Sequence, residues 1–397
     1  MPFPRFRRLF PYVALLFTCV AGWLFKAHCG AFWTGGEQYL TGCYSDAVPF
    51  WGLRGVAAGQ APYFQARIEY PVLTGALIWI EGLAVRLTLG ARGDAADFLL
   101  VVSAVNALLA FAVLRMMDRA GVARARLWLW ALAPPLVLYL GHNWDMLAVA
   151  LAVAALLAAR RDDAPTATAL AALGTAAKLF PVLLLPLLGL GALFRRGQGW
   201  GRRVAGAATL AAVAIGFWGV VNLPVASRAF TNWSEFYTFS RSRGGTAASV
   251  WEIIATRGWW VTDVATRNLW SFLAFAGGAA AIVALGWRRH GGRPWLLFTP
   301  VLAWFLLSNK VYSPQFDLWL YPFLLLTSTR LWPVLWFAAG DIAAYFAEFW
   351  WFAGLEGIGP GATAGHVALA AAARAAAMLW IIVAAIRQPA PGWIGRE

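Results

Sequence analysis

Long runs of apolar residues, separated by short basic or aromatic segments, recur along most of the chain. A helix that spans a bilayer needs about 20 mostly apolar residues, and somewhat fewer where the membrane is thin. The pattern therefore predicts an all-α polytopic membrane protein with about 12 transmembrane helices, in which residues 1–397 form a single integral-membrane domain. The predicted spans are 9–27, 98–114, 127–142, 144–159, 166–178, 180–194, 204–223, 270–286, 294–308, 316–329, 331–350 and 364–386.

One further apolar stretch, residues 71–90, is long enough to span a membrane but carries Glu81 and Arg86. The positive-inside rule, which gives most weight to short loops, bears on its position. If 71–90 crosses the membrane, nearly every short basic loop after it faces outward. We therefore expect 71–90 to be a helix lying on the outer surface, with both termini of the chain in the cytoplasm.

The composition excludes an ordinary soluble protein. Hydrophobic residues make up 61% of the chain and charged residues 13%, against about 45–50% and about 25% in soluble domains. The net charge of +14 would suggest nucleic acid in a soluble protein. Here the basic residues lie between apolar runs, as orientation charge on membrane loops. We expect membrane lipids as neighbours and no nucleic-acid partner.

Two outer loops, 34–97 and 224–269, are long enough to carry function, and all inner loops are short. The chemistry is therefore expected to face outward from a cell membrane. In the first loop, Asp46 precedes an aromatic stretch that would form a helix on the bilayer, so it is either a functional carboxylate or the N-cap of that helix. Glu69 lies just before Pro71, and is either a site residue or a charge stabilised by a helix N-terminus.

The segment GHNWD brings three polar side chains, His142, Asn143 and Asp145, to the outer edge of an apolar hairpin. A tight turn would explain Gly141 and Asn143 without any function. It would not require His142 and Asp145. Lining of a site and a simple turn therefore both stay open.

Lys178 ends a predicted helix of about 20 Å, which is too short to cross a hydrocarbon layer of about 30 Å. An ammonium group at that depth needs an anion, such as a lipid phosphate, or a water-filled cavity. The alternative is a lysine that snorkels to the interface.

The segment SNKVYSPQFDLW gathers Lys310, Tyr312, Gln315 and Asp317 on an outer turn that contains proline. These groups suit a phosphate or a sugar. The arginines of loop 224–269 either cover a site or contact lipid headgroups.

Two pairings concern the framework. Asp341 and Arg374 both fall near the middle of the membrane, and we expect them to pair with each other. Cys29 and Cys43 both fall on the outer side, where a disulfide is possible, although spacing alone does not fix the pairing.

Four segments resemble, in order, the integral-membrane glycosyltransferases of family 87, which have the GT-C fold: CYSDAVPFWGLRG with PYFQARIEYPVLTG, NWDMLAVALAVAALLA, GTAAKLFPVLLLPLL and SNKVYSPQFDLWLYP. The resemblance covers about residues 40–330. It implies a polyprenyl-phosphate sugar, typically polyprenyl-phosphate mannose, as donor on the outer membrane face. It also implies a catalytic carboxylate in the first outer loop, which matches Asp46.

Taken with the residues themselves, the resemblance predicts transfer of a hexose, with inversion, to a hydroxyl of a glycolipid or cell-envelope glycan. Asp46 would be the general base. The donor phosphate would be bound by Lys178, Lys310, Tyr312 and Gln315. The sugar and acceptor pocket would be lined by Glu69, Tyr70, His142, Asn143 and Asp145. No metal or other cofactor is expected, because lysines can neutralise a monophosphate leaving group.

The alternative is a lipid or sugar transporter, or a flippase, without chemistry. Such a protein would need charged or broken helices near the membrane midplane, and often inverted repeats. The polar residues gather at the outer face instead, which favours an enzyme. A non-catalytic membrane scaffold is a further alternative.

Overall fold

The computed structural model describes residues 6–359 and 361–395, which are helical apart from loops and one isolated bridge between Pro62 and Ala66. The helices, in chain order, are α1 (Phe6–Ala27), α2 (Glu37–Leu40), α3 (Ala47–Leu53), α4 (Val72–Leu89), η1 (Gly90–Arg92), α5 (Ala95–Arg119), α6 (Arg124–Ala131), α7 (Pro134–Tyr139), α8 (Asp145–Arg160), α9 (Ala164–Ala177), η2 (Phe180–Leu183), α10 (Leu184–Leu193), α11 (Trp200–Ala226), α12 (Phe230–Ser242), α13 (Val250–Thr256), α14 (Val264–His290), η3 (Pro294–Leu297), α15 (Phe298–Ser308), α16 (Phe316–Thr327), α17 (Trp332–Leu355) and α18 (Ala364–Arg387). The all-helical prediction is confirmed for this part of the chain.

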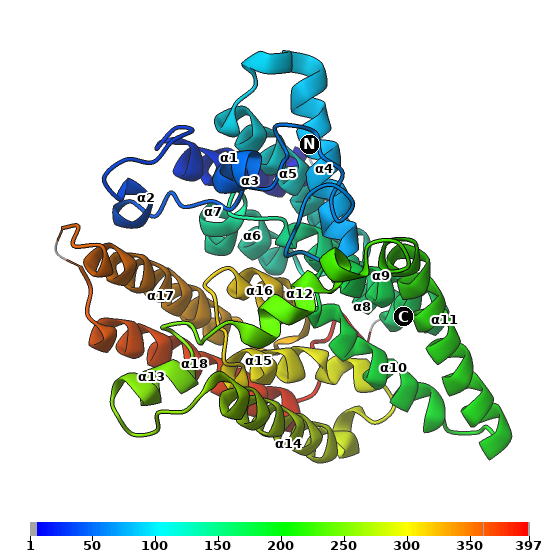
Figure 1. The fold of residues 1–397 in the computed structure, drawn as a ribbon. Helices are drawn as coiled ribbons and strands as arrows, with labels where there is room; N and C mark the ends of the chain where they lie inside the picture. The colour runs from blue at the N-terminus through cyan, green and yellow to red at the C-terminus, as the bar shows by residue number, and fades with distance from the viewer. Residues whose placement is uncertain (1–5, 360, 396–397) are drawn as a thin grey trace.

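The N-terminal helices, blue to cyan in Figure 1, form one side of the molecule, and α14, α17 and α18 form the opposite side, with α12 between them. The core centres on α8, with 12 of its 16 residues buried, and on α16, with 11 of 12 buried. Alanine dominates α8 and its neighbour α9, and small side chains let two helix backbones approach closely without a hydrophobic driving force. These two helices form one of the most extensive contacts in the molecule.

Six of the described helices are long and apolar enough to cross a membrane: Leu9–Ala27, Val72–Arg92, Ala95–Arg119, Trp200–Ala226, Val264–His290 and Ala364–Arg387. The chain is therefore compatible with a membrane-embedded protein. The larger count of 12 spans stays a prediction, as does the surface position of 71–90. The helix over that stretch, α4, packs against α5 and α9, and its Glu81 accepts a hydrogen bond from the Trp144 indole at 2.6 Å.

The predicted helix over 127–142 is wrong as a single element. The chain forms α6, breaks at Leu132 and Ala133, and restarts as α7 at Pro134. Proline has no N–H to donate, and it disfavours helical geometry in the residue before it. The Pro134–Pro135 pair therefore ends one helix and begins the next.

The expected pairing of Asp341 with Arg374 is also wrong. The guanidinium of Arg374 pairs with Asp317 of α16 at 2.7 Å, while Asp341 accepts a hydrogen bond from Tyr139. Gly340 explains the geometry, because a Cβ there would lie 2.8 Å from the Cα of Arg374. The backbone of α18 lies directly against α17, so the long arginine side chain extends past Asp341 to the next helix.

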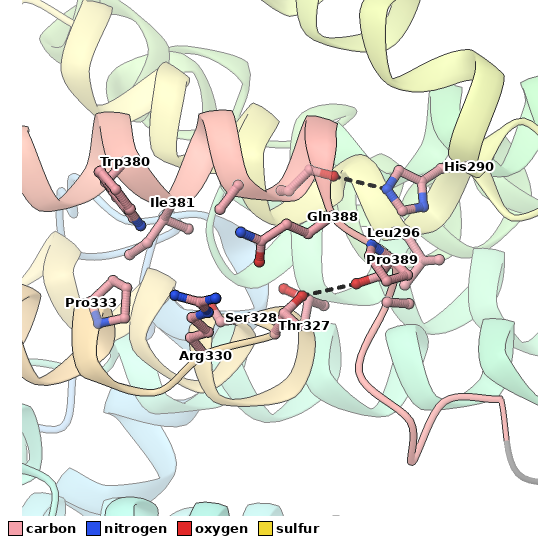
Figure 2. A pocket seen from close by; sticks show the side chains of 14 residues that line it. His290, Leu296, Thr327, Ser328, Arg330, Pro333, Trp380, Ile381, Gln388 and Pro389 are labelled. Carbon is pink, nitrogen blue, oxygen red and sulfur yellow. Dashed lines mark hydrogen bonds between the residues drawn. The ribbon is translucent and has the colours of Figure 1, made fainter.

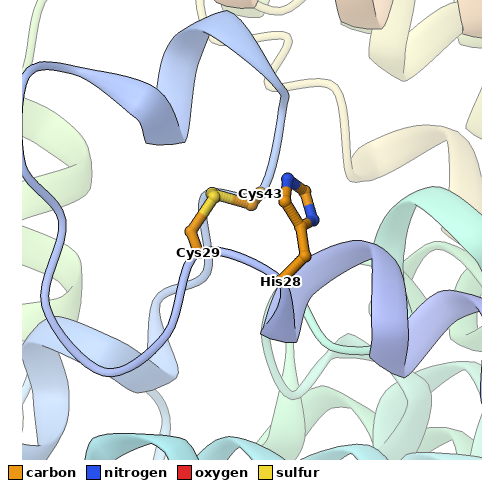
Figure 3. Close-up of side chains that lie close together, drawn as sticks. All are labelled: His28, Cys29 and Cys43. Carbon is orange, nitrogen blue, oxygen red and sulfur yellow. A yellow bond between two sulfur atoms is a disulfide. The ribbon is translucent and has the colours of Figure 1, made fainter.

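A disulfide joins Cys29, after α1, to Cys43, three residues before Asp46. Figure 3 shows His28 beside this bridge. Each of these three residues has one potential metal-ligand atom, and the three atoms lie within 4.8 Å of one another. Because the two sulfur atoms are bonded to each other, this trio does not offer a pair of thiolates to a metal.

Replacing Cys29 and Cys43 with serine is expected to lower the free energy of unfolding. Closing a loop of this length contributes about 3 kcal/mol in the chain-entropy description. Thermal unfolding of the purified protein in detergent would show a lower midpoint for the double variant. Reduction should lower the midpoint of the wild type and leave that of the variant unchanged. Equal midpoints for wild type and variant would contradict the prediction.

Candidate functional site

A cavity of about 640 Å³ opens between the N-terminal helices and α17. Its walls come from the first loop and α3, the start of α4, the junction of α9 with η2, α12, the segment 309–316 and α17. The volume falls in the range of small-molecule sites. Seven of the residues predicted from the sequence line it: Asp46, Glu69, Tyr70, His142, Lys178, Lys310 and Gln315.

Backbone contacts with the 141–145 turn fix the position of Asp46. Its N–H donates to the carbonyl of His142 at 2.8 Å, and the Ser45 hydroxyl donates to the carbonyl of Gly141 at 2.6 Å. Asp46 occupies the N-cap position of α3, but its side chain makes no capping hydrogen bond. The carboxylate is therefore free to face the cavity.

Two tyrosines hold the Asp46 carboxylate. The Tyr44 hydroxyl donates to Oδ1 at 3.0 Å, and the Tyr70 hydroxyl donates to Oδ2 at 2.8 Å. Burial raises the pKa of Asp46 above its ordinary value, while the hydrogen bonds from Tyr70 and Tyr44 and the positive charge of Lys178 oppose that shift. The result is an oriented carboxylate with enhanced basicity.

Lys178 extends from the end of α9 into the same cavity. Its ammonium pairs with Asp145 at 2.7 Å and lies 4.5 Å from the centre of the Tyr70 ring. The other oxygen of Asp145 accepts a hydrogen bond from the Trp319 indole at 2.7 Å. Asp145 is thus behind the cavity wall, where it fixes Lys178 and does not itself meet a ligand.

Asn143 and Tyr312 do not line the cavity. The Asn143 side chain accepts a hydrogen bond from the N–H of Asp145 at 3.0 Å, which is typical of an asparagine in a turn. The Tyr312 hydroxyl donates to Asp317 at 2.6 Å, and its ring lies 3.8 Å from the Arg374 guanidinium. Both side chains therefore support the framework, and neither is placed for direct contact with a ligand.

The opposite wall carries two cations, Lys310 and Arg243. The Lys310 ammonium donates to the carbonyls of Arg241 at 3.0 Å and Arg243 at 2.6 Å. Among the described residues, no carboxylate lies within ion-pairing distance of either cation. Burial lowers the pKa of Lys310, and the charges of Arg243 and Arg267 lower it further. This wall therefore has uncompensated positive charge that an anion would neutralise.

Glu69 is not available as an isolated carboxylate. It forms a two-pronged pair with Arg54 of the segment after α3, with both N–O distances at 2.8 Å. Such a pair fixes both side chains geometrically. The pair belongs to the rim of the cavity and links the first loop to the start of α4.

Two buried ionisable side chains near the site, Lys26 and Glu348, were not predicted from the sequence. Lys26 is fully buried at the end of α1, and its ammonium donates to the carbonyl of Gly42 at 2.9 Å. Glu348 lines the cavity from α17. A carboxylate within the apolar run 331–350 was the signal that could have identified Glu348, since charges in such runs are costly.

A second pocket, between the end of α16 and α18, is much smaller. Figure 2 shows it with Ser328, Arg330, Trp380 and Gln388 around it. Its volume of about 30 Å³ suits a water molecule but no substrate. The larger cavity is therefore the candidate functional site.

Replacing Lys178 with methionine should destabilise the protein, because it leaves Asp145 buried without its ion pair. Removing one partner of a buried pair typically costs about 3–5 kcal/mol. The double variant Lys178→Met with Asp145→Asn removes both charges and should recover much of this loss. Thermal unfolding of the three proteins measures the effect, and equal stability of the single and double variants would refute it.

Neither a model of a known protein family nor a curated protein matches the sequence. The function is therefore argued from the chemistry of the cavity.

Proposed function

We propose that the protein is a membrane glycosyltransferase that moves a hexose, such as mannose, from a polyprenyl-phosphate sugar to a hydroxyl of a glycolipid or cell-envelope glycan. One observation carries the proposal: a single cavity of about 640 Å³ contains a carboxylate held by two tyrosines, Asp46, and two cations, Lys310 and Arg243. Neither cation forms an ion pair with a described carboxylate. The apolar composition and the long apolar helices support a lipid-linked donor.

In this reaction Asp46 accepts the proton of the acceptor hydroxyl as its oxygen attacks the anomeric carbon. The new C–O bond forms while the bond from that carbon to the phosphate oxygen breaks, so the configuration inverts. The polyprenyl phosphate leaves with the bonding electrons. A carboxylate within hydrogen-bond reach of the proton contributes about 10²–10⁴ in rate.

The cations stabilise the charge that develops on the leaving phosphate. Lys310 and Arg243 are suited to this role because no carboxylate neutralises their charges. Lys178, by contrast, is paired with Asp145 and acts electrostatically on Asp46. Gln315 adds a neutral donor on the same wall. Fixed positive groups aimed at developing charge are among the strongest contributions to catalysis. Tyr312, buried against Asp317, contributes only by supporting that wall.

A transporter or flippase is the second candidate, since a cavity among apolar helices also suits a lipid carrier. The buried charges Asp317, Asp341 and Arg374 favour it, because charged groups inside apolar segments often mark transport pathways. These three, however, are engaged with one another or with tyrosines. The carboxylate that faces the cavity is therefore better explained by chemistry.

Asp46→Asn should slow transfer strongly while keeping the fold, because the amide preserves the shape and removes the base. Membranes with the wild type should move radiolabelled mannose from polyprenyl-phosphate mannose to a glycolipid or glycan, and the variant should be slower by about 10²–10⁴. Asp263→Asn, at the exposed N-cap of α14, is the matched control and should transfer normally. Equal transfer by Asp46→Asn would remove Asp46 as the base. Movement of labelled lipid across the membrane without transfer would favour the carrier.

The pH dependence should show an acid limb set by Asp46. The base must be ionised, and burial raises its pKa, so kcat/KM should fall as the pH drops through a value above the ordinary aspartate pKa of about 3.9. Measured over roughly pH 4 to 9, the limb should have unit slope. A rate that stays constant down to pH 4 would contradict an ionised Asp46 with a raised pKa.

A further inference from the structure

We propose that the acceptor ends in a pyranose ring, and that this ring binds at Glu348 and an aromatic wall on the α17 side of the cavity. The inference rests on the proposed glycosyl transfer and narrows its acceptor to a glycoside. It assigns a subsite opposite the cations Lys310 and Arg243.

Glu348 lines the cavity and has an unsatisfied hydrogen-bonding atom that a ligand could reach. Its side chain is 1% exposed and lines the cavity. Its Oε2 atom is buried and has no hydrogen-bond partner among the described residues. No ion pair joins Glu348 to another described residue. A buried carboxyl oxygen requires a hydrogen-bond partner, and a hydroxyl group, which both donates and accepts, can supply it in either protonation state.

Four rings beside Glu348 form a continuous surface, which we call the aromatic wall: Tyr39, Tyr44, Phe349 and Phe352. The Tyr39 ring lies 5.7 Å from that of Phe352 and 6.4 Å from that of Tyr44. The Tyr44 and Phe349 rings are 6.0 Å apart. Such a surface suits the C–H face of a pyranose, which is apolar while its edge carries hydroxyls.

The aromatic wall extends to Asp46, the proposed general base. Tyr44 belongs to the wall, and its hydroxyl donates to Oδ1 of Asp46 at 3.0 Å. A sugar resting on the wall would therefore have hydroxyls near both carboxylates, one to be held by Glu348 and one to be deprotonated by Asp46.

Other occupants fit this subsite less well. A phosphate would meet the Asp46 carboxylate, and like charges repel. A polyprenyl chain would leave Glu348 without donors, at the cost of an unsatisfied buried group. A serine or threonine of a protein acceptor offers one hydroxyl and no ring for the wall. A pyranose satisfies both the carboxylate and the rings.

The test measures binding of octyl α-D-mannopyranoside to the full chain, purified in a detergent without a sugar headgroup, by calorimetric titration. The wild type should bind the probe, and 1-O-octylglycerol, which keeps the chain and hydroxyls but lacks the ring, should bind far more weakly. Glu348→Gln should raise the Kd about tenfold, because the amide nitrogen cannot accept the hydrogen bond that a carboxyl oxygen accepts from the sugar. Phe352→Leu should raise it through loss of ring packing. Glu356→Gln, an exposed glutamate at the end of α17, is the matched control and should bind as the wild type does.

No binding by the wild type, wild-type affinity in Glu348→Gln, or displacement of the probe by a threonine peptide would each overturn the proposal. Unchanged thermal midpoints in the variants show that a loss of binding is not a loss of fold. Because the titration needs no turnover, it separates two failures. Glu348-dependent binding without mannosyl transfer would keep the sugar subsite and refute the transferase, and transfer without such binding would do the reverse.

Discussion

The ammonium group of Lys26 is buried where α1 ends, and the geometry of the site depends on it. It donates to the carbonyl of Gly42 and lies 4.8 and 4.9 Å from the ring centres of Phe25 and Tyr345. A buried amino group is tolerated only when hydrogen-bond partners replace water, as Gly42 and Tyr345 do here. Gly42 has a φ of +76°, and a Cβ there would lie 2.9 Å from the Tyr345 ring. The first loop can therefore pass between α1 and α17 only with glycine at this position.

From that point the chain reaches Asp46 in four residues, and each contact along the way restricts it further. Cys43 is bonded to Cys29, and Ser45 and Asp46 are hydrogen-bonded to the 141–145 turn. The candidate base thus lies on a loop that α1, α17 and the start of α8 hold together. Oriented carboxylates of this kind lose little freedom on binding a ligand, which is the physical basis of preorganisation. The cavity also contains both kinds of charge: Lys310 and Arg243 have no carboxylate partner among the described residues, whereas Lys178 and Arg54 are paired with Asp145 and Glu69.

The sequence predicted the residues that stand out locally. Asp46, Lys178 and Lys310 are polar side chains at the ends of apolar runs, and all three line the cavity. Asn143 and Tyr312 stood out in the same way, but their roles depend on neighbours that local pattern does not reveal. Tyr312, for example, stacks on Arg374 of α18, which is distant in sequence.

Helix existence was likewise easier to predict than helix pairing. The long apolar runs located the long helices but not the short helices of the two outer loops, and the Pro134–Pro135 pair was a visible reason for the break between α6 and α7. The choice of Asp317 over Asp341 as the partner of Arg374 follows from how closely α17 and α18 pack at Gly340. Lys26 and Glu348 were not identified because a single charge in an apolar run becomes meaningful only when its surroundings are known.

The bond between Cys29 and Cys43 also bears on when the site can be assembled. Disulfides form in oxidising compartments and not in the cytosol. Both cysteines precede Tyr345, which holds the same loop in place, by more than three hundred residues. Because a chain is synthesised from its N-terminus, the loop can be closed covalently before α17 is made. Maturation of the site would accordingly be sensitive to the redox state of the compartment during biosynthesis, long before any substrate is met.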